Sequence, residues 1–533
     1  MKYKILLSTL LILFAFLLTS GTAFAADFTE NPVRIETLQD LMDINNPAHL
    51  GKNYTLINNI NIGSEEIGTL EFTPIGTDAD PFTGEFDGQG FTISNITFTD
   101  ATMNGVGLFG VTDSALISNL KLREIDLTGK DYVGGLIGLA KDTVVTYCSI
   151  ENSANFDITG NNSVGGLIGR TTMDSEISNS YAASNVEGNY AAGGFVGYMF
   201  DSSEISESYA NGRVKGVDGV VLSSSNVGGF VGYMLGSSKI FDSFAIGNVE
   251  GNRTVGGFVG SMRGTSSIVD SYATGNANSN SDAGGFAAII YDDSSISRSY
   301  SSGNVKGQWA GGFVGTMNDD SSIEDSYATG NANGLDKDAG GFVSYMNQDS
   351  SITGSYATGN ANGDGIVGGF AGEIIFSIGT PVITDSFYIG APNSNNNDKG
   401  FFVTSAKLKQ IETFELNGGY VSISWDISSS PDQASIWYIN EGNGYPKFEW
   451  YEPQKGGPGT GGATVVDNIP TQNAPIENIP VVNNTPQNII PPQNNSPIQE
   501  NTVESKTATF QWLLLLIGAL LLIFILFIFL YKR

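Results

Sequence analysis

A five-residue segment, Gly-Gly-Phe-Val-Gly at residues 193–197, recurs along most of the chain and decides its fold. With the glycine just before the Leu or Phe as the marker, its copies stand at positions 107, 135, 166, 194, 229, 257, 285, 312, 341 and 369. The intervals between markers are 27 to 31 residues, apart from one of 35 residues. Ten copies at this spacing indicate one structural unit repeated along the chain.

A second segment, Ser-Ser-Ile-Val-Asp-Ser-Tyr-Ala-Thr-Gly-Asn at residues 266–276, recurs in related forms between most of the markers. The apolar runs of both segments are short and bounded by Gly, Asn, Asp and Ser, which is typical of strands and turns rather than helices. Each unit therefore contains at least two short strands. Stacked parallel coils, each advancing about 4.8 Å, would bury an apolar face that one unit cannot bury alone.

The repeat thus predicts an all-β fold, a parallel β-solenoid of about ten coils, with the right-handed winding that parallel crossovers usually have. The interior would hold a ladder of phenylalanines. Its members are Phe195, Phe230, Phe258, Phe286, Phe313, Phe342 and Phe370. Cys148 stands where other copies have a serine, so we expect a small side chain that faces inward.

The Gly-Gly-Phe-Val-Gly units and the intervening Ser-Tyr-Ala-x-Gly-Asn segments resemble GLUG-motif repeats, over roughly residues 33–451. Such repeats occur in bacterial and archaeal surface proteins, including adhesin-like proteins, and in the non-catalytic part of some bacterial IgA peptidases. The resemblance implies surface presentation and adhesion, but the repeat is a scaffold signature that transfers no catalytic residue. A His-Glu-x-x-His zinc motif is excluded, because His49 is the single histidine of the chain.

Segments on both sides of the repeats have the patterns of end caps. Apolar residues at helical spacing, from Ile35 through Leu38 and Leu41, predict a helix that covers the N-terminal end of the solenoid. After the repeats, Ser405 is expected to cap a helix that carries Leu408, Ile411 and Phe414, followed by a closing aromatic segment from Trp437 to Trp450. The expected parts are the N-terminal cap with the first coils (26–105), the repeat solenoid (106–390) and the C-terminal cap (391–451).

Both ends of the chain have patterns that direct a protein to a membrane. Residues 1–25 combine two lysines, an apolar run and small residues near Ala25, which predicts a secretory signal peptide. Residues 452–508 are rich in Pro, Asn and Gln and predict a disordered linker. Residues 509–531 predict one transmembrane helix, and Lys532 and Arg533 then form a cytoplasmic tail. A retained N-terminal anchor and a C-terminal segment removed by a sorting enzyme are the alternatives.

Composition excludes several classes of function. The net charge of −30, from 25 Lys and Arg against 55 Asp and Glu, argues against nucleic acid and anionic lipid as partners. The acidic residues are spread along the chain, which favours solubility over any one partner. A single cysteine excludes an intrachain disulfide framework and a Cys-based zinc cluster.

An aromatic ladder in the second segment is the first candidate for ligand binding. Its members are Tyr181, Tyr209, Tyr272, Tyr300, Tyr327 and Tyr356, with Phe244 and Phe387. Small neighbours such as Ala273 would point inward, so alternation turns the rings outward, where a stripe of rings could stack against sugars. The alternative is that the rings cover a corner of the solenoid and pack on neighbouring coils.

Acidic pairs in turns are the candidate metal ligands. Asp292 with Asp293 and Asp319 with Asp320 would come close in stacked coils, where Ca²⁺ could bridge their carboxylates. The alternative is solvated turn residues, because their spacing matches no known calcium loop. We therefore expect no cofactor, with Ca²⁺ as the alternative.

The sequence favours a non-enzymatic protein of the cell surface, single-pass with its N-terminal part outside. We expect an adhesin or an envelope structural protein whose partners are surface glycans or proteins. A polysaccharide lyase or hydrolase on the same scaffold is the alternative, although no coil interrupts the repeat with a clustered acid and base. Glycosylation sequons stand at Asn53, Asn95, Asn161, Asn252, Asn483 and Asn494.

Overall fold

The computed structural model describes the part of the chain that holds the repeats and both caps. Its described residues are 31–63, 72–155, 157–217, 225–376, 379–390, 400–422, 424–430 and 435–448. The predicted signal peptide (1–25), linker (452–508), transmembrane helix (509–531) and tail (532–533) lie outside these ranges. The chain divides into Met1–Glu452 and Pro453–Arg533, and all described residues belong to the first unit. None of the helices in the described ranges combines the length and apolarity that a membrane crossing requires.

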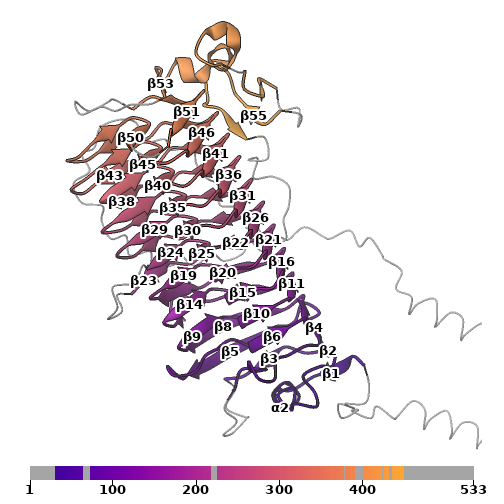
Figure 1. Cartoon of the computed structure of the whole chain (residues 1–533). Coiled ribbons are helices and arrows are strands. Elements are labelled where there is room, and N and C mark those ends of the chain that lie inside the picture. The colour runs from indigo at the N-terminus through magenta and orange to yellow at the C-terminus, as the bar shows by residue number, and fades with distance from the viewer. Residues whose placement is uncertain are drawn as a thin grey trace, which may run out of the picture. The chain divides into compact units, whose positions relative to one another are not determined.

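The repeats fold into an all-β parallel solenoid of about 11 turns, which confirms the predicted fold class (Figure 1). Each strand lies in register between its equivalents from the neighbouring coils. Val196–Met199 (β20), for example, pairs in parallel with Ile168–Thr172 (β15) on one side and Val231–Met234 (β25) on the other. Equivalent residues of the repeat therefore form rows along the solenoid. The right-handed winding stays a prediction.

Each repeated coil contains five short strands, where the sequence indicated at least two. In one coil they are Asn162–Gly165 (β14), Ile168–Thr172 (β15), Glu176–Ser178 (β16), Tyr181–Ala183 (β17) and Asn185–Gly188 (β18). The strands equivalent to β14 form a 9-stranded sheet, those equivalent to β15 a 10-stranded sheet and those equivalent to β16 a 13-stranded sheet. The strands equivalent to β17 and β18 form two ladders, which the long strand Lys121–Thr128 (β8) joins. Glycine, asparagine and serine between the apolar residues end the five strands of this coil after three to five residues.

The glycines of the repeated segment lie where backbones touch. A Cβ atom added to Gly193 would stand 2.0 Å from the carbonyl oxygen of Val196, and one added to Gly194 would stand 2.2 Å from that of Gly229 in the next coil. Neither glycine has a positive φ. Close backbone approach, not an unusual backbone conformation, therefore explains why the repeat requires glycine here.

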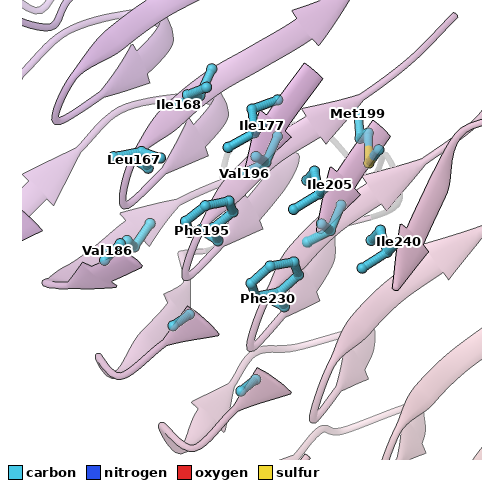
Figure 2. Packing of buried hydrophobic residues seen from close by; sticks show 14 of the residues in the cluster. Leu167, Ile168, Ile177, Val186, Phe195, Val196, Met199, Ile205, Phe230 and Ile240 are labelled. Carbon is cyan, nitrogen blue, oxygen red and sulfur yellow. The ribbon is translucent and has the colours of Figure 1, made fainter. Parts of the chain in front are cut away.

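The phenylalanine ladder runs through the interior of the solenoid, as predicted. The rings of Phe195 and Phe230 lie 4.7 Å apart, and later neighbours as far as Phe370 lie 4.8 to 4.9 Å apart. All of these rings are fully buried. Figure 2 shows Phe195 and Phe230 in one row and Ile177, Ile205 and Ile240 in the row that faces them.

A serine ladder satisfies the backbone at one corner of the coils. The amide of Ser208 donates to Oγ of Ser243, 3.3 Å away, and that hydroxyl donates in turn to the carbonyl of Phe241. Cys148 begins this ladder, because its amide donates to Oγ of Ser180 at 3.0 Å. The cysteine is buried, and burial raises the pKa of its thiol to about 12, so it is a neutral packing residue. The predicted inward-facing small residue is confirmed.

Replacing Cys148 by serine should therefore be tolerated. Ser180 and the later members of the ladder show that a hydroxyl fits this corner and finds a carbonyl acceptor. We expect Cys148→Ser to change the free energy of unfolding by less than about 1 kcal/mol, and Cys148→Asp to lower it by at least about 2 kcal/mol, because it would place a carboxylate at this buried corner. Urea unfolding of both variants measures this, and equal loss in both would contradict the assignment.

The N-terminal end carries the predicted helix, but Ile35 lies in the strand that precedes it and not in the helix. Leu38–Asp43 (α2) begins after Thr37, whose hydroxyl accepts from the amide of Asp40 while the Asp40 carboxylate accepts from the amide of Thr37. Leu38 and Leu41 are buried in the core of the first coils. Figure 1 shows α2 beside Val33–Ile35 (β1), the first strand of the 13-stranded sheet.

The C-terminal cap differs from the prediction of one helix that begins at Ser405. Three short 3₁₀ turns form instead, Lys407–Lys409 (η2), Ile411–Phe414 (η3) and Leu416–Gly418 (η4). Gln410 between the first two is extended and interrupts a continuous helix. The hydroxyl of Ser405 lies 2.8 Å from that of Tyr445 and caps nothing, so that part of the prediction is wrong.

Candidate functional site

The tyrosine ladder forms a continuous stack on the outer side of its strands. Neighbouring rings from Tyr181 to Tyr356 lie 4.8 to 5.0 Å apart with interplanar angles of 2 to 7°. The small residue after each of these rings is buried, an alanine such as Ala210 in every coil except that of Tyr300, where it is Ser301. The outward direction that strand alternation predicted is therefore correct for this row.

The C-terminal cap covers the second half of this stack. Tyr300, Tyr327 and Tyr356 are 3%, 6% and 1% exposed, and they belong to one apolar cluster with the residues of the cap. The ring of Trp437 lies 5.9 Å from that of Tyr356, whose hydroxyl donates to the carbonyl of Pro446. The open stripe predicted for all six tyrosines is therefore wrong for these three, because the closing aromatic segment packs on them.

The first half of the stack remains at the surface, where Tyr181, Tyr209, Phe244 and Tyr272 are each partly exposed. Neighbouring rings cover one face of Tyr181 and both faces of the other three, and the Tyr181 hydroxyl donates to Glu151. Ring edges and the hydroxyls of the later tyrosines are therefore the groups that can contact a ligand. Burial raises the pKa of Tyr209 to about 12, which keeps its hydroxyl protonated and able to donate. Hydrogen bonding to a glycan suits this geometry better than face-to-face stacking on sugars.

The acidic pairs lie in tight turns. Asp292, Asp293, Asp319 and Asp320 all have φ between 52 and 55°, a left-handed conformation that aspartate adopts more readily than most residues. The amide of Asp293 donates to the carbonyl of Asp319 in the next coil. Across the described ranges, no group of three or more His, Cys, Asp or Glu side chains is placed to hold a metal. The turn conformation accounts for these residues, and calcium binding stays a prediction.

Four of the six sequon asparagines lie in the described ranges, and each is partly exposed. The Asn95 amide nitrogen donates to Asn61, and the side-chain oxygens of Asn161 and Asn252 accept from the equivalent asparagines of the next coil, Asn189 and Asn280. The oxygen of Asn53 accepts from the amide of Glu85. Asn483 and Asn494 lie outside the described residues.

A second surface, which the repeat analysis missed, lies on the 10-stranded sheet. The residue after Phe-Val-Gly faces outward there and is, in five successive coils, Leu139, Arg170, Tyr198, Tyr233 and Ser261. The chemical character of the side chain at this position changes more between copies than at any other position of the segment. This variation could have identified the surface from the sequence. The constant positions of a repeat maintain the fold, so a particular ligand is recognised at variable ones.

Arg170 is the centre of this surface. Its guanidinium carbon lies 4.8 Å from the ring centroid of Tyr198, 5.7 Å from that of Tyr132 and 5.6 Å from that of Phe200. Tyr198 stacks in turn on Tyr233, with the centroids 5.0 Å apart. We call these five residues the Arg170 cluster.

Comparison with known proteins supports the assignment of the repeat. Residues 160–187 match the family model described as "Glug: The GLUG motif". This match covers one coil, from the turn before β14 into β18. The chain therefore carries GLUG repeats, as its resemblance implied, and one GLUG unit is one turn of the solenoid.

Two relatives match shorter regions. Halomucin of Haloquadratum walsbyi is 34% identical over 142 residues, which are 23% of this chain and 2% of halomucin. A protein of Evansella cellulosilytica, assigned as a Gly-rich membrane protein, is 33% identical over 95 residues, 17% of this chain and 11% of the relative. The matched regions are thus a small part of the relatives' own length.

Two solved structures are also similar. An IgA1 protease matches at 16% identity and a TM-score of 0.29, over 72% of this chain and 24% of the other. A Bacteroides ovatus protein assigned as an immunoglobulin A1 protease matches at 16% identity and a TM-score of 0.27, over 79% of this chain and 93% of the other.

Proposed function

We propose that this chain is a non-enzymatic protein of the cell surface, an adhesin-like β-solenoid that binds glycans. The observation that carries the proposal is the unbroken register of its ladders, from β15 through β20 and β25 to the last coils. This register repeats the outward rings of the tyrosine ladder every 4.8 to 5.0 Å along the solenoid. A surface with such a short repeat suits a polymer that itself repeats, because many weak contacts add up along its length.

The relatives support a location at the cell surface. One carries the name halomucin and the other is assigned as a membrane protein, and each matches less than a quarter of this chain. The predicted signal peptide and transmembrane helix point the same way. We propose that residues 26–451 stand outside the cell, connected through the linker 452–508 to a membrane helix at 509–531.

The partners in this proposal are glycans or proteins of other cells or of the envelope. The partly exposed rings of Tyr181, Tyr209, Phe244 and Tyr272 form one contact surface, and the Arg170 cluster forms another. Both lie on strands whose backbone is fixed by neighbours on each side. Rigid strands hold binding groups at constant spacing and lower the entropy that binding costs.

A binding screen of the full-length chain against glycans and intact cells, with product analysis for every polysaccharide bound, tests the proposal. We expect saturable binding without cleavage. Depolymerisation of a bound polysaccharide would instead establish the enzyme alternative. Failure to bind any glycan or cell would leave a structural role in the envelope.

Hydroxyl contacts can be tested without disturbing the stack. Phe244 occupies the same position as Tyr209 and Tyr272 in the neighbouring coils, so phenylalanine fits this row. We expect the double variant Tyr209→Phe, Tyr272→Phe to unfold at the same temperature as the parent and to bind the glycan about 30-fold more weakly, at roughly 1 kcal/mol for each of the two lost hydrogen bonds. Unchanged affinity would mean that this stack is structural only. Tyr356→Phe, beneath the C-terminal cap, is the control that should leave glycan affinity unchanged.

A further inference from the structure

Arg170 keeps an uncompensated charge at the surface of the solenoid. Six ion pairs join described residues, and none of them includes Arg170. Its Nε is buried and has no hydrogen-bond acceptor. Aromatic rings, not carboxylates, hold this guanidinium in place.

This arrangement is unusual in a chain with 55 acidic and 25 basic residues. Three other arginines of the described solenoid form ion pairs, Arg213, Arg263 and Arg298, and Arg298 pairs with both carboxylate oxygens of Asp270. Rings can position a guanidinium through stacking without consuming its donors. The planar set of N–H groups that results is pre-organised to bind a carboxylate through two parallel hydrogen bonds.

We propose that the Arg170 cluster binds an acidic polysaccharide through the carboxylate of a uronic acid residue. The inference rests on the proposed glycan-binding function and names its substrate class. The guanidinium would pair with the carboxylate, while the neighbouring rings of Tyr132 and Phe200 contact the apolar side of the sugar. One guanidinium with one charge matches a uronate, because more highly charged phosphate groups are usually held by several cations.

The stack beyond Arg170 extends the site along the solenoid. Tyr198 and Tyr233 occupy the same outward position in the next two coils, with ring centroids 5.0 Å apart. Burial raises the pKa of both tyrosines, so both hydroxyls stay protonated and can donate to successive sugars of one chain. The net charge of −30 opposes a long polyanion, as it opposes nucleic acid, so the proposed ligand is a short acidic segment whose carboxylate contacts Arg170 locally.

Titration of the full-length chain with oligogalacturonate tests the proposal. The methyl-esterified oligosaccharide is the control ligand, because it has the same sugars without the negative charges. Arg170→Leu is the main variant, since Leu139 occupies the same position in the preceding coil and leucine therefore fits the ladder. We expect Arg170→Leu to weaken oligogalacturonate binding at least 10-fold, and Arg170→Lys to weaken it less. The methyl ester should bind the parent as weakly as the acid binds Arg170→Leu.

Arg213→Gln is the control, because it removes one positive charge from a different ladder, where Arg213 pairs with Glu187. It should leave oligogalacturonate affinity unchanged, and all variants should unfold at the parent's temperature. Equal binding of the acid and its ester, or equal affinity of the parent and Arg170→Leu, would overturn the proposal. If the parent binds neutral glycans or cells but not oligogalacturonate, this inference fails while the proposed function stands. If it binds no glycan and no cell, both fail.

Discussion

Replacing Gly312 by alanine should unfold the middle of the solenoid locally. The added Cβ would stand 2.0 Å from the carbonyl oxygen of Gly341 in the next coil, a separation that real atoms do not reach. The neighbouring backbone must move, and it belongs to ladders that hold every coil in register, such as Ala339–Gly340 (β44) on Trp309–Gly311 (β39). We expect a loss of about 3 kcal/mol in the free energy of unfolding, because overpacking against backbone cannot relax through a side chain.

Hydrogen exchange measures where this loss occurs. Because each coil of a solenoid contacts only its neighbours, protection should fall around Val314–Met317 (β40) and Val343–Met346 (β45) and persist at Ile137–Lys141 (β10). Gly444→Ala is the matched control, because the nearest atom to its added Cβ is 3.7 Å away and its φ is not positive. A Gly312→Ala protein that keeps the parent's protection in β40 and β45 would show that close backbone packing does not explain the repeat.

The spacing of the repeat was sufficient to predict the solenoid but not the number of strands in each coil. Ten markers at nearly constant intervals leave stacking as the way to bury Phe195 and its equivalents, and in-register stacking then follows. Several of the five strands, such as Tyr209–Ala210 (β22), have only two residues. Two residues are too few to show a periodic pattern of apolar residues. These strands can therefore be identified only from their pairing with neighbouring coils in the structure.

The covered tyrosines could not be predicted because their cover comes from outside the repeat. Tyr356 contacts Trp437 and Pro446, which are 81 and 90 residues further along the chain (437 − 356 and 446 − 356) and belong to no periodic pattern. The same limit applies to Arg170, whose contact with Tyr198 follows from the register of two coils. Repeat analysis identifies what all copies share, and both features are properties of particular copies.

The attachment of the C-terminal cap should depend on pH through Asp325. This residue follows Ser322–Glu324 (β41), and its Oδ1 accepts a hydrogen bond of 3.3 Å from Nε1 of Trp437 in the cap. Burial beneath the cap raises its pKa from the ordinary value of 3.8 to about 6. The hydrogen bond from Trp437 and the charge of Arg298 oppose this shift, while Glu324 and Asp426 add to it. The folded protein therefore favours the protonated carboxyl more than the unfolded chain does.

The sign of the pH dependence follows from this difference. Below about pH 4 the carboxyl is protonated in both states, so the folded protein bears no penalty. Between about pH 4 and 6 the unfolded chain ionises first, and stability is lost until the folded carboxyl ionises as well. Above pH 6 the full penalty is present, which is at most about 3 kcal/mol for a shift of roughly two units and nearer 2 kcal/mol for a partly exposed group.

Asp325→Asn should remove this penalty, because asparagine stays neutral and keeps an oxygen that accepts from Trp437. We expect the variant to match the parent at pH 4 and to be more stable by about 2 kcal/mol at pH 7.5. Urea unfolding followed by tryptophan fluorescence at both pH values measures the difference, since Trp425 and Trp437 lie buried in the cap. Asp320→Asn, in an exposed turn, is the control that should show no such dependence. Equal stabilisation at pH 4 and 7.5 would mean that the gain comes from packing or hydrogen bonding and not from the ionisation of Asp325, and the cap would then be held independently of pH.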